Sequence, residues 1–148
     1  MGTENPTHVT APTKFVSSNG IRFAYRRFGN ESGVPLLFMQ HFRGGLDHWD
    51  PSVTDGFSHD RQVILFDNAG VAGSSGETPS TIDAMADDTR SFVDALGLAH
   101  FDLLGFSMGG YVAQAFAIGN SARPKRAAPS SKWHLSLKPT SLVARDDI

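Results

Sequence analysis

One pentapeptide and its surroundings constrain the fold of this chain most. Ser107 stands between two glycines in Gly105-Phe106-Ser107-Met108-Gly109, after a mostly apolar run, 101–106, and before a run with helical spacing, 108–119. This pattern predicts a strand, a tight turn and a helix. Glycines two residues before and after the serine remove Cβ atoms that would collide in such a turn.

The turn would raise the Ser107 hydroxyl above the sheet. It would also point the Met108 backbone N–H, at the positive end of a helix, toward an oxyanion formed on an acyl group attacked by Ser107.

A second apolar run, 34–40, is typical of a parallel strand covered on both faces, and it leads into His41-Phe42-Arg43-Gly44-Gly45. In acyl-transfer sites of this kind, the loop after the third strand supplies the second oxyanion donor, so we assign that role to the Phe42 backbone N–H. For the His41 side chain we favour a role in bracing the loop over direct chemistry. Gly44 is expected to shape the same loop.

A third predicted strand, 61–66, runs into a loop over 67–76 that is rich in small and turn-forming residues. So many small and turn-forming residues indicate unusual backbone dihedral angles and a backbone that packs closely against its neighbours. Asp67 and Gly70 are the expected loop-shaping residues. A phosphate-binding loop is the rival interpretation. It is disfavoured because no lysine follows and the G-x-G-x-x-G spacing is absent.

These three motifs, 41–51, 67–75 and 105–110, together resemble the α/β-hydrolase superfamily, in its branch of small serine hydrolases similar to esterases and cofactor-free haloperoxidases. The resemblance covers about residues 14–121. It implies Ser107 as nucleophile, backbone donors at Phe42 and Met108, loop-shaping roles for Gly105 and Gly109, and no cofactor. A serine at the elbow points away from the epoxide-hydrolase and haloalkane-dehalogenase members, whose nucleophile is a carboxylate. Relatives commonly carry glycine where this sequence has Ala72.

The predicted fold class is α/β, a truncated α/β-hydrolase fold with a mostly parallel sheet. Residues 14–18 and 21–28 are expected to form an antiparallel N-terminal hairpin around Asn19-Gly20, a dipeptide suited to positive φ. Residues 81–96 are the best amphipathic helix of the chain, with Ser80 or Thr81 able to cap its start and Gly97 its end. Its polar face, which we expect to be solvated, carries charged residues: Asp83, Asp87, Arg90 and Asp94. Residues 1–13 are expected to be a flexible N-terminus.

Composition excludes several classes of function. The net charge of −2 gives no reason to expect a nucleic-acid partner, and the absence of cysteine excludes disulfides and thiolate metal sites. Six histidines are scattered without metal-ligand spacing, so we expect no metal. No apolar stretch approaches membrane-spanning length and the start of the chain has no signal pattern. We therefore expect a cytoplasmic protein with no membrane partner.

The balance of positive and negative residues reverses after residue 121. Residues 1–121 hold seven Lys/Arg and thirteen Asp/Glu, whereas 122–148 hold six and two. The prolines and charges of 122–132 predict an irregular tail over 122–148. We hypothesise that the chain is a truncated gene product whose tail is out of register with the ancestral reading frame. Without a following strand, 101–106 would lie at an open sheet edge, through which the chain could self-associate.

The expected function is hydrolysis of a small ester or related acyl substrate through an acyl-Ser107 intermediate, with little or no activity because no triad acid or histidine is recognisable. The tail offers His134 with Asp146 or Asp147, an arrangement we disfavour because an irregular segment seldom holds a base accurately. A non-catalytic fragment or interaction partner, completed by another chain, is the first alternative. Haloperoxidase or perhydrolase chemistry at the same serine is the second.

Overall fold

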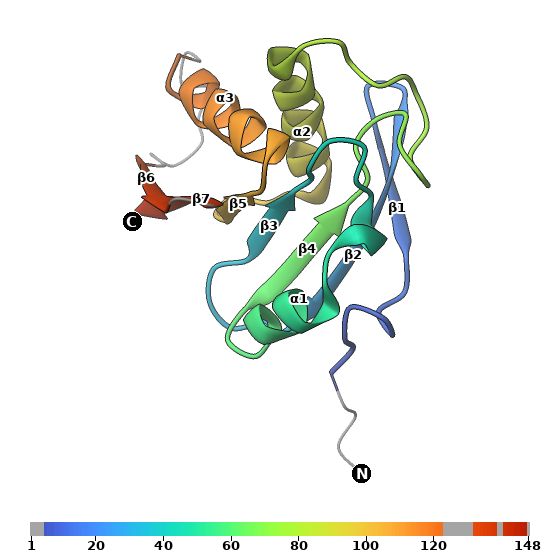
Figure 1. Ribbon diagram of the computed structural model, residues 1–148, viewed down its shortest axis with the longest axis vertical. Coiled ribbons are helices and arrows are strands. Elements are labelled where there is room, and N and C mark those ends of the chain that lie inside the picture. Colours follow the sequence, from blue (N-terminus) through green and yellow to red (C-terminus); the bar gives the residue numbers. More distant parts are fainter. Residues whose placement is uncertain (1–4, 123–131, 139–140, 148) are drawn as a thin grey trace.

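The computed structural model describes residues 5–122, 132–138 and 141–147, and Figure 1 shows their arrangement as a sheet flanked by helices. The elements in chain order are β1 (Lys14–Ser18), β2 (Ile21–Gly29), β3 (Leu36–Met39), η1 (Leu46–His48), α1 (Pro51–Ser58), β4 (Gln62–Phe66), α2 (Ile82–Leu96), β5 (Asp102–Gly105), α3 (Met108–Ala122), β6 (Lys132–Lys138) and β7 (Ser141–Asp147).

The strands form one mixed sheet in the order β1-β2-β4-β3-β5-β7-β6. β1 and β2 pair antiparallel from Lys14 opposite Tyr25 to Ser18 opposite Ile21, and their turn places Asn19 at φ 50° and Gly20 at φ 77°. β3 lies parallel to both β4 and β5. The predicted α/β class, with a parallel centre and an antiparallel N-terminal hairpin, is confirmed.

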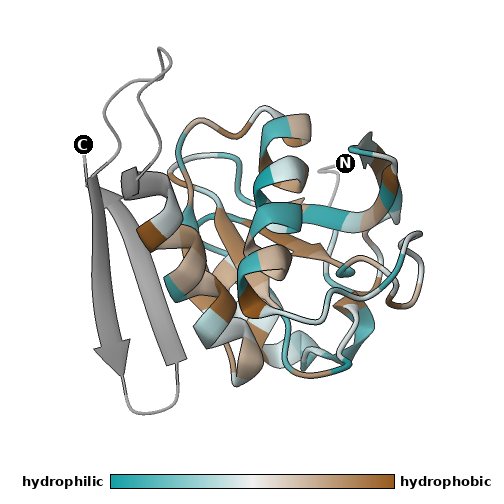
Figure 2. Cartoon of the chain, turned by 90° about the horizontal axis from the view of Figure 1, so that it is seen from above, coloured by the Kyte–Doolittle hydropathy of each residue, from teal (hydrophilic) through white to brown (hydrophobic). Residues whose placement is uncertain are grey.

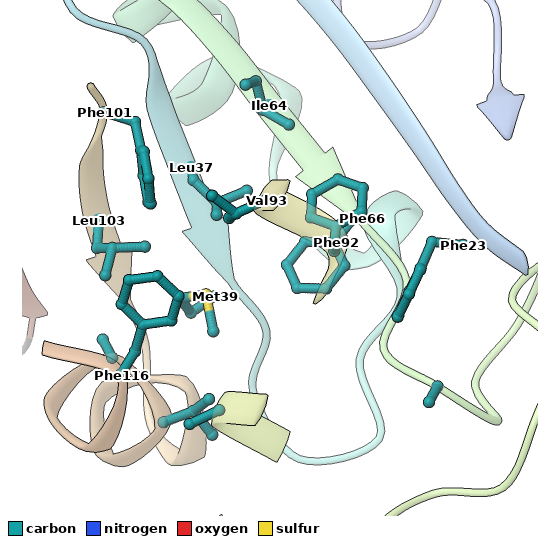
Figure 3. Close-up of a cluster of buried hydrophobic side chains, with 14 residues drawn as sticks. Phe23, Leu37, Met39, Ile64, Phe66, Phe92, Val93, Phe101, Leu103 and Phe116 are labelled. Atoms are coloured by element: carbon teal, nitrogen blue, oxygen red, sulfur yellow. The ribbon is translucent and has the colours of Figure 1, made fainter. Parts of the chain in front are cut away.

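The side chains of the central strands alternate between two buried faces, as period-two geometry requires. Leu37 and Met39 of β3 face α2 and α3 and pack in a cluster with Phe92 and Phe116, as Figure 3 shows. Phe38, in contrast, lies on the opposite face, edge-on to Trp49 at 4.8 Å between ring centroids. Both faces of β3 are thus covered, which explains its unbroken apolar sequence.

The amphipathic helix forms as predicted, as α2. Thr81 Oγ1 accepts from Ala84 N at 3.1 Å, and Gly97 ends the helix at φ 67°. Figure 2 shows hydrophilic and hydrophobic stretches along this helix, beside α3. The prediction that Arg90 faces water is wrong: Arg90 is 7% exposed, and its Nη2 donates to the backbone carbonyls of Ala115 and Phe116. Carbonyl groups of the neighbouring α3 thus solvate this guanidinium in place of water.

The segment before β1 also differs from expectation. Residues 5–13 are not a loose terminus, because His8 is 2% exposed and its Nδ1 lies 2.8 Å from Thr54 Oγ1 in α1. The His8 backbone N–H donates to Asp55 Oδ1 at 2.7 Å, and Arg26 of β2 donates to the His8 carbonyl at 3.2 Å. Contacts on both sides hold the described part of this segment against β2 and α1.

The expectation of an irregular tail over 122–148 needs correction where the structure describes that range. β7 pairs antiparallel with β5, Leu104 opposite Val143, and β6 pairs with β7. The edge of β5 that the sequence analysis left open is therefore occupied. The missed signal is the alternation of Trp133, Leu135 and Leu137 with polar residues, a strand pattern that the nearby prolines and charges obscured. Residues 123–131 lie outside the described ranges. The hypothesis that the tail is out of register with the ancestral reading frame concerns the coding DNA and stays a prediction.

Candidate active site

Ser107 stands at the sharp junction between β5 and α3. Its φ is 55°, in the left-handed region that costs an L-residue with a side chain about 1–2 kcal/mol. The turn is closed by two backbone hydrogen bonds, from Gly109 N to Phe106 O at 3.0 Å and from Gly110 N to Ser107 O at 2.9 Å. Ser107 is exposed. The strand, strained turn and helix predicted from the sequence are all present.

The two glycines of the pentapeptide are required by close backbone contacts. A Cβ at Gly105 would lie 2.5 Å from the carbonyl oxygen of Gly109. A Cβ at Gly109 would overlap the carbonyl oxygen of Met39 and lie 2.6 Å from that of Gln40. Backbone atoms of a central strand cannot move aside as the end of a flexible side chain can. Glycine at both positions thus allows α3 to begin directly against β3.

The two residues assigned as backbone oxyanion donors line one cavity. Phe42 and Met108 both line a cavity of about 420 Å³. Within residues 5–122, neither backbone N–H donates to a protein acceptor, and Met108 is the first residue of α3, where an amide has no partner within the helix. Ser107 directly precedes Met108, although it is not among the residues that line this cavity. The Met108 amide therefore lies next to Ser107 in the chain, and the pairing of Phe42 with it as a second donor stays a prediction.

His41 is enclosed by its own loop and by aromatic rings. The Gly44 N–H donates to the His41 carbonyl at 3.0 Å, and a Cβ at Gly44 would lie 2.5 Å from His41 Cε1. The rings of Trp49 and Phe106 lie 6.3 and 6.0 Å from the imidazole, between centroids. These contacts explain why Gly44 cannot carry a side chain without displacing the imidazole, and the loop-bracing role of His41 stays a prediction.

Asp67 joins the two loops that border the site. Its carboxylate accepts from Leu46 N at 2.6 Å through Oδ1 and from Gly73 N at 3.0 Å through Oδ2, and the residue is only 3% exposed. Gly70 has φ 72°, and a Cβ there would lie 2.7 Å from the backbone of Glu77. Ala72 also lies at positive φ, 45°, which accounts for glycine being common at this position in the resembled family.

No general base is positioned by the described residues. Among the hydrogen bonds within 5–122, none involves the Ser107 hydroxyl. His134 lies on β6, the outermost strand, which β7 separates from β5. Strands two places apart are about 10 Å apart. The side chains of His134, Asp146 and Asp147 lie outside the described residues, and the placement of β6 gives no support to the disfavoured base from the tail.

Arg43 is a residue of this pocket that was not among the residues predicted from the sequence. Arg43 follows the Phe42 donor, lines the same cavity, and adopts φ 58°. The sequence could have drawn attention to Arg43, because this residue directly follows the assigned donor Phe42.

The described residues contain no group of three His, Cys, Asp or Glu side chains arranged to hold a metal ion. Nor does any helix in the described ranges have the length and apolar character needed to cross a membrane.

Fold and elbow together define an α/β-hydrolase, and the comparisons with known proteins agree. Residues 34–128 match the alpha/beta hydrolase fold family, and the chain belongs to it. An alpha/beta hydrolase fold protein from Chitinophaga pinensis has a solved structure that is 51% identical, with a TM-score of 0.74 over 76% of this chain and 41% of that one.

Curated relatives are more distant. The non-heme chloroperoxidase of Streptomyces lividans is 32% identical over 107 residues, which are 67% of this chain and 38% of that protein. RutD of Azorhizobium caulinodans, which bears the name of a carbamate hydrolase, is 28% identical over 103 residues, 69% of this chain and 38% of that protein. The chain thus spans about 38% of the length of these relatives.

Proposed function

We propose that this chain carries the nucleophile and oxyanion site of a serine hydrolase that acts on a small ester or related acyl substrate. The observation that carries the proposal is the exposed Ser107 at φ 55° on the junction of β5 and α3, next to the Met108 amide, which has no protein acceptor within residues 5–122. Attack by the hydroxyl on an acyl carbon would form an acyl-Ser107 intermediate. The amides of Phe42 and Met108 would stabilise the oxyanion of the preceding tetrahedral species.

Turnover by the chain alone is expected to be slow. A serine hydroxyl is a weak nucleophile without an adjacent base, and no described residue supplies one. Removing a triad member can cost a factor of about 10⁶ in turnover, while binding and the oxyanion site retain about 10³–10⁴ over water. In this fold family the acid and the histidine follow the serine in the chain. We expect a complete active site to obtain them from such a segment or from another chain.

A fluorophosphonate probe tests the proposal, because donors that bind a carbonyl oxyanion would also bind the phosphonyl oxygen and promote slow phosphonylation of Ser107 even without a base. We expect mass spectrometry to find one adduct, on the peptide containing Ser107, and Ser107→Ala to abolish it. Ser17→Ala is the matched control, because Ser17 is also exposed and lies on β1. Labelling of folded protein at other serines only, or at none, would contradict the proposal.

The absence of a base among the described residues favours a second candidate, a non-catalytic chain that acts as an interaction partner or is completed by another chain. Folded protein that never reacts with the probe supports this candidate. Similarity to the chloroperoxidase supports a third candidate, haloperoxidase or perhydrolase chemistry at the same serine. Peroxide-dependent bromination of monochlorodimedone in carboxylate buffer, abolished by Ser107→Ala, would identify it.

A further inference from the structure

Among the described residues, the cavity lined by Phe42 and Met108 has one positively charged side chain and no carboxylate. Among the described residues that line it, Arg43 is the only charged one, and Asn68 and Thr78 add uncharged polar groups. The remaining lining residues are apolar or small. A pocket of this kind offers hydrogen-bond donors and one positive charge, with no carboxylate to compensate it.

The guanidinium of Arg43 is available to a ligand. Within the described part of the chain, no carboxylate lies within ion-pair distance of it. The nearby acidic groups are engaged elsewhere: Asp47 pairs with Arg26, and Asp67 accepts from two backbone amides. Arg43 is exposed, and its guanidinium carbon lies 5.8 Å from the centroid of the Phe42 ring.

The backbone places the base of the Arg43 side chain next to the assigned donor. Arg43 directly follows Phe42, so their Cα atoms are about 3.8 Å apart. The turn that places Arg43 at φ 58° is held by the bond from Gly44 N to His41 O at 3.0 Å. The base of the Arg43 side chain is therefore one residue away from the N–H assigned to the acyl carbonyl oxygen.

We propose that this pocket selects acyl substrates that carry a carboxylate on the acyl chain, with Arg43 as the specificity-determining residue. The inference rests on the proposed function, because it concerns the same oxyanion site. A guanidinium can bind a carboxylate through two parallel N–H···O bonds, which a neutral acyl chain cannot accept. Asn68 stands on the same cavity wall and adds a neutral donor.

The test compares two activated esters of similar length, p-nitrophenyl hemisuccinate and p-nitrophenyl butyrate. Ser107 Oγ forms the bond to the acyl carbon, the ester bond breaks with its electron pair on p-nitrophenolate, and the hydroxyl proton passes to buffer base. Burst release of p-nitrophenolate and the mass of the Ser107 peptide report acylation. We expect at least a tenfold preference for the hemisuccinate, since a hydrogen bond to a charged group is worth about that factor or more.

Variants separate specificity from structure. Arg43→Gln is expected to reduce the preference to about one, and Arg43→Lys to retain part of it, with a stronger loss at high salt. Arg22→Gln is the matched control, because Arg22 is also exposed and lies over a phenylalanine ring, that of Phe15, at 3.5 Å. Equal acylation of wild type by the two esters, or an equal loss of both rates in Arg43→Gln, would overturn the inference and leave the proposed function standing. If neither ester acylates Ser107, the proposed function fails and this inference falls with it.

Discussion

The loop that holds the Phe42 amide depends on one buried carboxylate, so Asp67→Asn is the most informative perturbation of stability. Asp67 receives two backbone N–H bonds, from Leu46 at 2.6 Å and from Gly73 at 3.0 Å. An asparagine offers one oxygen and one NH₂ group in the same place. One of the two amides would then face another donor, and the other would lose the charge of its acceptor.

The expected magnitude follows from these two bonds. A hydrogen bond to a charged group contributes about 1.5–3 kcal/mol, and a buried amide left without an acceptor costs about 1–3 kcal/mol. Losing one such bond and weakening the other should lower the free energy of unfolding by about 2–4 kcal/mol. Since small domains are stable by only about 5–15 kcal/mol, this is a large fraction of the total.

Urea unfolding followed by tryptophan fluorescence measures the change. Asp94→Asn is the matched control, because Asp94 is exposed on α2 and its carboxylate makes no hydrogen bond within the described residues. Its effect should stay within about 0.5 kcal/mol. We also expect Asp67→Asn to slow fluorophosphonate labelling of Ser107, because the loop carrying the second donor loses its anchor. An Asp67→Asn midpoint equal to that of the control would show that the Asp67 carboxylate does not anchor the loop.

Three further predictions concern single residues. Ala72→Gly should raise the free energy of unfolding, measured in urea titrations, by up to about 1 kcal/mol. The strain of an alanine Cβ at φ 45° would be removed, and this gain exceeds the entropic cost of ordering a glycine. Thr81→Ala should lower the free energy of unfolding by about 1 kcal/mol, because the hydrogen bond from Ala84 N to Thr81 Oγ1 is lost. A decrease smaller than about a quarter of that would contradict the assignment of Thr81 as the N-cap of α2. Burial, followed by the charge of Arg26, lowers the pKa of His8 from 6.5, against the opposing charges of Asp47 and Asp55. The neutral ring therefore stabilises the fold fully above pH 6.5, and this contribution is lost as pH falls through the lowered pKa. The difference in unfolding free energy between wild type and His8→Gln should shrink on acidification, and a difference independent of pH would exclude the mechanism.

Local sequence was sufficient for the elements that carry the site. The turn at Ser107 follows from its two flanking glycines, and α2 follows from its periodicity and from Thr81 and Gly97 at its ends. In each case, residues within a few positions of one another determine the backbone. The hairpin at Asn19-Gly20 was predictable for the same reason.

Contacts between distant segments could not be predicted in this way. Periodicity places Arg90 opposite the apolar stripe of α2, but its hydrogen-bond partners are carbonyls 25 and 26 residues away. His8 likewise owes its burial to Thr54, 46 residues further on. The pocket beside Phe42 joins four separate stretches of the chain. The availability of Arg43 depends on where the other charges are paired, which only the folded structure shows.

We propose that Ser107 reacts beside the backbone amides of Phe42 and Met108, and a crystal structure of its phosphonate adduct would locate the phosphonyl oxygen. We expect that oxygen about 2.7–3.1 Å from both the Phe42 and the Met108 nitrogen. A phosphonyl oxygen directed into solvent, or one that accepts from neither or only one of these amides, would rule out the proposed oxyanion site.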